Sequence, residues 1–237
     1  PPVFVYRKNS AAGLVDELQS DGPFTVFAPT DDAFAKLPEG TVETLLKPEN
    51  KQRLIDVLTY HVVSGRIPAK QVVSLQGAVT LNGQRLDIST GQGAVRVDNA
   101  QVLTTDIECR NGIIHAVDSV LLPASDPIPT VAAKSEQFDT LLAAAKAAGL
   151  DEVLSGPGPF TVFAPTDDAF AKLPEGTVES LLKPQNKQKL VQVLKYHVLP
   201  ARVYSEEALA AATAQTLQGQ PLKIAAKADA AFVNEAK

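Results

Sequence analysis

The sequence of 237 residues contains no methionine and no tryptophan, and it has a single cysteine, Cys109. One cysteine excludes a disulfide within the chain and any metal site that needs several thiolates. We expect Cys109 to be a small buried apolar side chain, because free cysteines are among the most buried residues. Since methionine is missing even at position 1, we expect the chain to be part of a longer polypeptide, so a missing signal peptide or anchor carries no information.

Long apolar runs and basic clusters are also missing. No apolar run approaches the roughly 20 residues that a helix needs to cross a bilayer, so the sequence predicts no transmembrane segment within these residues. The net charge is −5 without any basic block, which argues against a nucleic-acid partner because phosphate binding needs clustered lysine and arginine. The sequence lacks an Asn-x-Ser/Thr acceptor for N-glycosylation, which favours a bacterial source.

Signature motifs of several enzyme classes do not occur. There is no Gly-x-Ser-x-Gly serine elbow, no His-Glu-x-x-His zinc motif and no Gly-x-Gly-x-x-Gly phosphate-binding turn. The three histidines are not spaced as metal ligands, and a zinc site needs three or four ligands that converge on one point. We therefore expect no catalytic residues, no cofactor and no metal, and we predict that the protein is not an enzyme.

What the sequence does contain is one long segment in two copies. Residues 22–62 return as residues 158–198 with 35 of 41 positions identical, at a constant offset of 136 residues. This period is too long for a solenoid repeat and has the length of an ordinary domain, so it predicts two tandem domains. We place domain 1 at residues 1–123, a proline-rich linker at 124–130 and domain 2 at 131–237. The start of domain 1 is atypical, and domain 2 ends before the counterpart of the last hairpin of domain 1.

Within each copy, apolar residues at helical spacing come first and strands with period two follow, which predicts an α+β domain with an antiparallel sheet. Residues 131–148 are expected to form one helix. A short strand precedes Thr30, a good N-cap residue, so that Asp31 lies in the first turn of the next helix. The Asn82-Gly83 pair predicts a β-hairpin with a type I′ turn, in which both central residues have positive φ.

Three motifs occur in a fixed order along the chain. The first is Phe-Thr-Val-Phe-Ala-Pro-Thr-Asp-Asp-Ala-Phe at residues 24–34, repeated at residues 160–170. The second is Tyr-His-Val at residues 60–62 and 196–198, and the third is Asp-Ile-Glu-Cys-Arg-Asn-Gly-Ile-Ile-His-Ala-Val-Asp at residues 106–118. In this order and at a domain-length spacing, the motifs resemble those of the fasciclin I-type domain family. The resemblance covers nearly the whole chain.

The resemblance implies two tandem copies of a wedge-shaped β-sandwich with helices packed on one side. It also implies a secreted, periplasmic or cell-surface protein that acts in adhesion by binding a cell-surface or matrix protein or polysaccharide. Two rigid domains on a semi-rigid linker would combine weak contacts into avidity. A second possibility stays open, in which an apolar cleft between sheet and helices carries a small apolar ligand such as a lipid or pigment.

The motif residues either hold the scaffold or contact a partner. They are Thr30, Asp31, Tyr60, His61, Asn111, Gly112, His115, Thr166, Asp167, Tyr196 and His197. We expect the aspartates at the helix starts to complement the helix dipole, because adjacent helical side chains point in different directions and cannot converge. We expect the histidines to be hydrogen-bonded and partly buried. In the family the tyrosine–histidine pair is proposed as a receptor-contact motif, whereas its place beside the apolar stripe of its helix favours packing.

Overall fold

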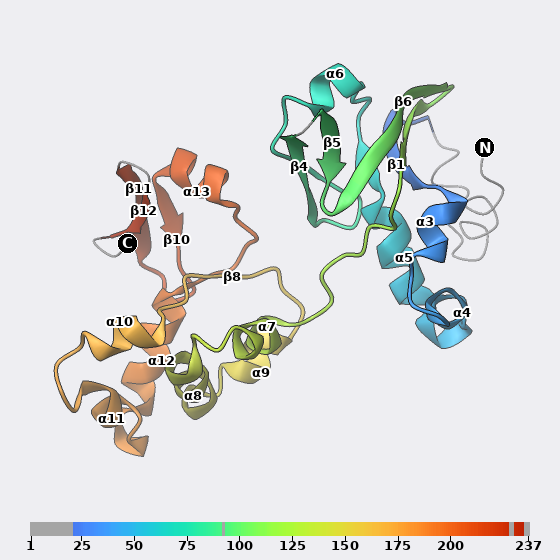
Figure 1. Cartoon of the computed structure of the whole chain (residues 1–237). Coiled ribbons are helices and arrows are strands. Elements are labelled where there is room, and N and C mark those ends of the chain that lie inside the picture. Colours follow the sequence, from blue (N-terminus) through green and yellow to red (C-terminus); the bar gives the residue numbers. More distant parts are fainter. Residues whose placement is uncertain (1–20, 92, 228–229, 235–237) are drawn as a thin grey trace. The chain divides into compact units, whose positions relative to one another are not determined.

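The computed structural model describes residues 21–91, 93–227 and 230–234 of the chain. The chain divides into two compact units with the boundary between Ala124 and Ser125, which we call unit 1 and unit 2 (Figure 1). Each unit combines helices and strands, so the predicted α+β class with two tandem units is confirmed. Within the described ranges, no helix has the length and apolar character needed to cross a membrane.

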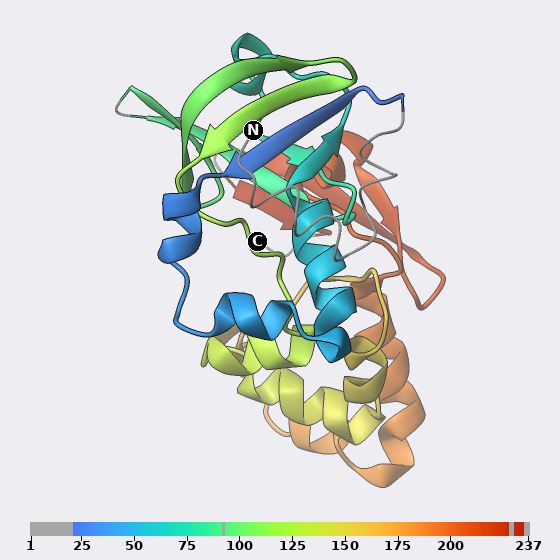
Figure 2. The same cartoon turned by 90° about the vertical axis from the view of Figure 1, so that its right-hand side faces the viewer.

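Unit 1 is built on one seven-stranded sheet with the order β2-β1-β7-β6-β5-β4-β3. The strands are β1 (Phe24–Pro29), β2 (Val62–Ser64), β3 (Gly77–Val79), β4 (Arg85–Gly91), β5 (Ala94–Val97), β6 (Ala100–Cys109) and β7 (Gly112–Val117). β1 pairs in parallel with β7, and the other neighbouring strands are antiparallel. Figure 2 shows β1, in blue, beside the green β6–β7 hairpin. A bridge between Val63 and Thr80 brings the two ends of the sheet together, which makes the sheet barrel-like.

The main core of unit 1 lies on the inner face of this sheet. Its largest fully buried apolar side chains are Phe27, Leu86, Val97, Val117 and Leu121. Along β4 the buried Leu86 and Ile88 alternate with more exposed residues, as expected of a strand with one face in the core. Since each fully buried large side chain contributes about 1.5–3 kcal/mol, these residues make a large favourable contribution to folding.

The helices of unit 1 are α3 (Asp31–Ala35), α4 (Thr41–Leu45), α5 (Lys51–Tyr60) and α6 (Ala69–Val72), with a 3-10 turn at Pro48–Asn50. α3 begins after Thr30, whose side-chain oxygen accepts the Ala33 N–H at 3.2 Å, so the predicted N-cap is confirmed. α5 turns its apolar stripe towards a second apolar cluster. This cluster comprises Leu45, Leu54, Val57 and Val120.

Unit 2 contains α7 (Ile128–Lys134), α8 (Asp139–Ala148), α9 (Asp151–Ser155), α10 (Asp167–Ala171), α11 (Thr177–Leu181), α12 (Lys187–Tyr196) and α13 (Ser205–Ala211), with a 3-10 turn at Pro184–Asn186. One sheet pairs β8 (Thr161–Val162) with β9 (Val198–Leu199). A second sheet has the order β10-β11-β12, formed by Thr213–Gln215, Pro221–Lys227 and Ala230–Val233. α8 packs against α12 and α10. The resulting core cluster comprises Leu141, Ala144, Ala148, Leu150, Leu190 and Leu194.

The expectation of one helix over residues 131–148 is wrong. α7 and α8 are separate helices, and between them Glu136 has a left-handed φ of +54°. The connection reads Ser-Glu-Gln-Phe, so its first three residues offer no apolar side chain that could hold a continuous helix against the core. α7 also begins at Ile128, inside the segment predicted as linker, because Pro129 fits the first turn of a helix without losing a backbone hydrogen bond.

The predicted hairpin between β3 and β4 is confirmed, but its turn is not of type I′. The Thr80 N–H donates to the Gln84 carbonyl at 2.9 Å, and the Gly83 N–H donates to the Thr80 carbonyl at 2.9 Å. Within this loop Gly83 has a positive φ of +85°, whereas Asn82 does not have a positive φ. The turn is therefore a three-residue loop in which a type I turn is followed by a left-handed glycine. Unit 2 uses Gly219 in the same way, with φ of +98°.

Candidate functional site

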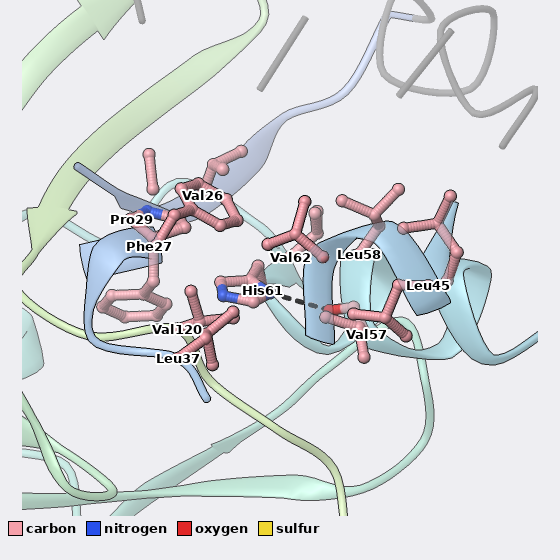
Figure 3. Close-up of a pocket in the computed structure, with 14 residues that line it drawn as sticks. Val26, Phe27, Pro29, Leu37, Leu45, Val57, Leu58, His61, Val62 and Val120 are labelled. Carbon is pink, nitrogen blue, oxygen red and sulfur yellow. Dashed lines mark hydrogen bonds between the residues drawn. The ribbon is translucent and has the colours of Figure 1, made fainter. Parts of the chain in front are cut away.

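The tyrosine–histidine motif of unit 1 lies where α5 ends and β2 begins. His61 is buried, and its two ring nitrogens face different backbone groups. Figure 3 shows the hydrogen bond to Val57. Nδ1 lies 2.7 Å from the Val57 carbonyl oxygen, and Nε2 accepts the Leu121 N–H at 3.0 Å. Because a carbonyl only accepts and an N–H only donates, the ring is neutral and carries its proton on Nδ1. The ring therefore ties α5 to the segment that follows β7.

The lowered pKa of His61 agrees with a neutral ring. Burial lowers the pKa of His61 from 6.5 to about 4, and the hydrogen bond to the Val57 carbonyl offsets part of that shift. The cause is that a charged imidazolium loses its hydration in an apolar environment. Since both ring nitrogens are engaged by the backbone, the side chain is not available as a metal ligand or as a general base.

Apolar side chains surround His61 in a pocket between β1 and the helices α3, α4 and α5 (Figure 3). Residues that line it include Val26, Phe34, Leu37, Leu54, Leu58 and Val120. The cavity has a volume of about 40 Å³, which holds only a few water molecules at roughly 10–15 Å³ each and is far below the roughly 300–1,000 Å³ of small-molecule pockets. The pocket of unit 1 is therefore too small for a lipid or a pigment.

The motif tyrosines hold the ends of α5 and α12 in place. The Tyr60 hydroxyl lies 2.8 Å from Oδ2 of Asp98, and Oδ1 of Asp98 accepts the Asp87 N–H at 2.8 Å. In unit 2, Nδ2 of Asn234 donates to the Tyr196 hydroxyl at 3.1 Å. Asp98 and Asn234 have positive φ angles of +51° and +56°, which aspartate and asparagine adopt more readily than most residues. Each tyrosine thus joins its helix to the residue that follows a strand, β5 in unit 1 and β12 in unit 2.

His115 plays a similar part on β7. It is almost completely buried, and its ring centroid lies 5.5 Å from that of Phe27. Nε2 lies 2.9 Å from the Ile67 carbonyl oxygen, and Nδ1 accepts the Asp106 N–H at 3.3 Å. The proton is therefore on Nε2, the opposite nitrogen from His61. Oδ1 of Asp106 in turn accepts the Ala69 N–H at 2.9 Å, so the motif ties β6 and β7 to the start of α6.

Asn111 and Gly112 form the turn from β6 to β7. The Asn111 carbonyl accepts the Phe24 N–H at 2.9 Å. Gly112 lies so close to β1 that an added Cβ would overlap the Phe24 carbonyl oxygen, so only glycine permits this approach. Cys109, expected to be buried, is half-buried, because it ends a strand whose preceding residues are exposed.

The aspartate of the first motif has a larger role in unit 2 than the sequence indicated. Thr166 caps α10 by accepting a backbone N–H of that helix at 3.3 Å. Oδ1 of Asp167 accepts the Thr140 N–H at 2.8 Å, and Oδ2 accepts the Asp139 N–H at 3.2 Å. These hydrogen bonds, chiefly those from Thr140, lower the pKa of Asp167. The carboxylate thus joins α10 to the first turn of α8. The positions of unit 1 that match Asp139 and Thr140 lie outside the described residues.

The structure does not bring the predicted site residues of unit 1 to one place. His61 lines the pocket between β1 and the helices, whereas His115 lies in a separate small cavity with Val72 and Val102. In the ranges that the structure describes, no group of three or more His, Cys, Asp or Glu side chains could hold a metal ion. Instead, each histidine of unit 1 links separate backbone segments through its own hydrogen bonds.

Sequence reasoning missed three contributors to this arrangement. Leu121 supplies the N–H for His61, and Asp98 supplies the acceptor for Tyr60. Thr25 donates from Oγ1 to the Gly65 carbonyl at 2.7 Å and accepts the Ile67 N–H at 2.9 Å. The repeat offered a signal for two of them, because Asp98 matches Asn234 and Thr25 matches Thr161 at the same offset of 136 residues.

Comparisons with known proteins agree with the repeat and with the motifs. A family model described as Fasciclin domain matches residues 5–123 and 136–237. Protein sll1483 of Synechocystis sp. is 54% identical over 113 residues, which are 48% of this chain and 62% of that protein. Transforming growth factor-beta-induced protein ig-h3 of Sus scrofa is 30% identical over 224 residues, 93% of this chain and 32% of that protein. The chain thus spans less than two thirds of the length of these relatives.

Two further matches cover nearly the whole chain. Periostin of Homo sapiens is 29% identical over 233 residues, which are 98% of this chain and 28% of that protein. A solved structure of a FAS1 domain pair from the insect cell adhesion molecule Fasciclin I matches with a TM-score of 0.43 at 15% identity. That match covers 98% of this chain and 87% of the other chain.

Proposed function

Because the chain belongs to the fasciclin domain family, we propose that it is a non-catalytic adhesion module. It binds a cell-surface or matrix protein or polysaccharide, in a secreted, periplasmic or cell-surface setting. The observation that supports the proposal is that polar side chains of the motifs form hydrogen bonds inside the fold. His61, His115 and Tyr60 are engaged in hydrogen bonds within the scaffold of unit 1, which leaves the outer surface of that unit for contact with a partner.

Two units in one chain favour binding by avidity. Linking two binding modules makes the second contact intramolecular, which can raise overall affinity by about 10²–10⁴-fold when the linker lets both modules engage. The test is binding of residues 1–237 and of residues 1–124 to the surface of cells of the source organism, with circular dichroism to check that the shorter chain folds. We expect the two-unit chain to bind at least tenfold more tightly. Equal affinities would contradict avidity, and no saturable binding by either would contradict adhesion.

A second candidate function, the carriage of a small apolar ligand, has one observation in its favour. Unit 2 contains a cavity of about 290 Å³ among α7, α8 and α12, close to the lower end of the roughly 300–1,000 Å³ that small-molecule pockets occupy. Its lining is largely apolar and includes Phe138, Leu141 and Leu194. Native mass spectrometry of protein purified from its source would detect a retained ligand. A carrier predicts a mass above that of the polypeptide, and a bare polypeptide would contradict it.

A further inference from the structure

We propose that the solvent-facing side of α12 in unit 2 binds a linear acidic polysaccharide. This binding rests on the proposed adhesive function and deepens it, because it assigns one class of ligand to one surface. We call this surface the α12 face, and it consists of Lys187, Gln188, Lys189, Gln192 and Lys195.

The two copies of the repeated block differ at six of 41 positions, and half of these differences change the charge. The differences that keep the charge are Thr44 with Ser180, Arg53 with Lys189 and Ile55 with Val191. Those that change it are Glu49 with Gln185, Asp56 with Gln192 and Thr59 with Lys195. Each of these three makes unit 2 more positive. Residues 183–195 contain four lysines and no acidic residue, whereas residues 47–59 contain three basic and two acidic residues.

Two of the three charge changes fall on one side of a single helix. Gln188, Gln192 and Lys195 follow one another at spacings of four and three residues, so their side chains share a face of α12. Leu190 and Leu194 are buried on the other side of the helix, in the core of unit 2. A shallow hollow of about 540 Å³ runs along the exposed side, lined by Lys187, Gln188, Lys189, Val191 and Gln192.

The polar side chains of the α12 face are available to a ligand, in contrast to their counterparts in unit 1. There Oδ1 of Asp56 accepts a hydrogen bond from Nε2 of Gln52 at 2.9 Å, so the carboxylate and the amide satisfy each other. In unit 2 the matching residues are Gln192 and Gln188. Neither these amides nor Lys195 has a hydrogen-bond or ion-pair partner among the described residues.

The exposure of this face is a property of the helix in both units. In unit 1 the segment that follows β7 packs against α5, and the matching residues Lys51, Gln52 and Arg53 are exposed all the same. The two units therefore present the same side of the same helix to solvent. They differ in the charge that this side carries.

One lysine of the α12 face also has a structural role. The Lys187 ammonium lies beside Gly149, the residue that ends α8. The C-terminal end of a helix attracts a positive charge, so this contact stabilises α8. Lys189 and Lys195 have no ion-pair partner within the described ranges, and they supply the charge for the ligand.

The chemistry of the face fits an acidic polysaccharide. Lysine ammonium groups attract carboxylate or sulfate groups, and glutamine amides both donate hydrogen bonds to hydroxyls and accept them. Although the chain has a net charge of −5, charges more than about 10 Å apart are largely screened at 0.1 M salt. The local lysines therefore dominate the field that a bound anion experiences.

Two other polyanions fit less well. A helix that lies on an anionic membrane must bury its apolar side in the lipid, and the apolar side of α12 is already packed in the core through Leu190 and Leu194. Nucleic-acid-binding domains are typically basic overall and use arginine, whereas this chain is acidic overall and the α12 face contains no arginine.

The test is biolayer interferometry of the whole chain on immobilised alginate, a linear polyuronate, with neutral dextran as the reference. We expect saturable binding to alginate that weakens as the salt concentration rises from ~50 to ~200 mM. The variant Gln185→Glu/Gln192→Asp/Lys195→Thr gives unit 2 the charges of unit 1, and it should bind at least about fivefold more weakly. The matched control Ser180→Thr/Lys189→Arg/Val191→Ile exchanges the other three positions without changing the charge, and it should bind as the unaltered chain does.

Both variants carry side chains that unit 1 accommodates at the matching positions, so we expect both to fold, with circular dichroism as the check. Equal affinities of the two variants for alginate would overturn the proposal. So would the absence of saturable binding to alginate, equal binding to dextran, or tighter binding to duplex DNA or to anionic lipid vesicles.

Binding to cells of the source organism separates this inference from the adhesive function on which it rests. A chain that binds cells but not alginate would overturn the polysaccharide site and leave the adhesive function intact. A chain that binds neither would contradict both. A chain that binds alginate through the α12 face but does not bind cells would support the site and contradict adhesion.

Discussion

Acid should weaken unit 1 through His61. Its pKa falls from 6.5 in the unfolded chain to about 4 in the folded one. Between these values the unfolded state binds a proton that the folded state does not, so folding stability is fully present above pH 6.5 and is lost as the pH falls towards 4. A difference of roughly 2.5 units at 1.36 kcal/mol per unit amounts to about 3 kcal/mol. This is a large part of the 5–15 kcal/mol by which a typical domain is stable.

The assay is urea unfolding at pH 7.5, 5.5 and 4.5, with amide resonances of α5 and β1 as reporters of unit 1. Carboxylates also titrate in this range, so the His61→Gln variant serves as the control that lacks the imidazole. The variant is expected to be less stable at pH 7.5, and its disadvantage should shrink by about 2–3 kcal/mol at pH 4.5. A stability difference between the two proteins that stays constant with pH would show that His61 does not cause the acid sensitivity, and so would an imidazole that titrates near 6.5 in the folded state.

Three substitutions test the packing of unit 1, each by the shift in its urea unfolding midpoint. Gly112→Ala should destabilise by at least about 2 kcal/mol because its Cβ would overlap a β1 carbonyl, whereas Gly91→Ala, with open space around it, should change little. Tyr60→Phe should cost about 1–2 kcal/mol, because a part-buried carboxylate loses its hydroxyl partner, and an unchanged midpoint would contradict this role. Leu86→Ala should cost about 2–5 kcal/mol, and Leu103→Ala, at a site 53% exposed, less than about 0.5 kcal/mol. Equal losses at the two leucines would show that the core is placed wrongly.

Features set by neighbouring residues could be predicted from the sequence. The cap at Thr30 needs only the hydroxyl and the first turn of the next helix, and the structure contains it. The β3–β4 hairpin was predictable because turn residues separate two alternating segments. Its turn type was not, because an Asn-Gly pair suits both a type I′ turn and a type I turn that ends on a left-handed glycine, and strand register decides between them.

Features that depend on tertiary contacts could not be predicted. The apolar stripe of α5 placed His61 beside the core, but its neutral state follows from the Leu121 N–H, which comes from a distant part of the chain. Asp98 has no local signal for its bond to Tyr60, and only the matching Asn234 of the second copy hints at it. The sequence does not predict the break between α7 and α8 at Glu136. The apolar residues on either side of it have the spacing of one continuous helix, and only the structure shows that the polar residues between them interrupt it.

The polar residues of the motifs hold backbone segments together. Nitrogen-15 NMR of the imidazole rings at pH 7 tests it most directly. We expect two buried neutral rings with opposite tautomers, protonated on Nδ1 in His61 and on Nε2 in His115, and no change on addition of Zn²⁺. Rapid exchange between tautomers, or a shift of both rings when metal is added, would contradict it.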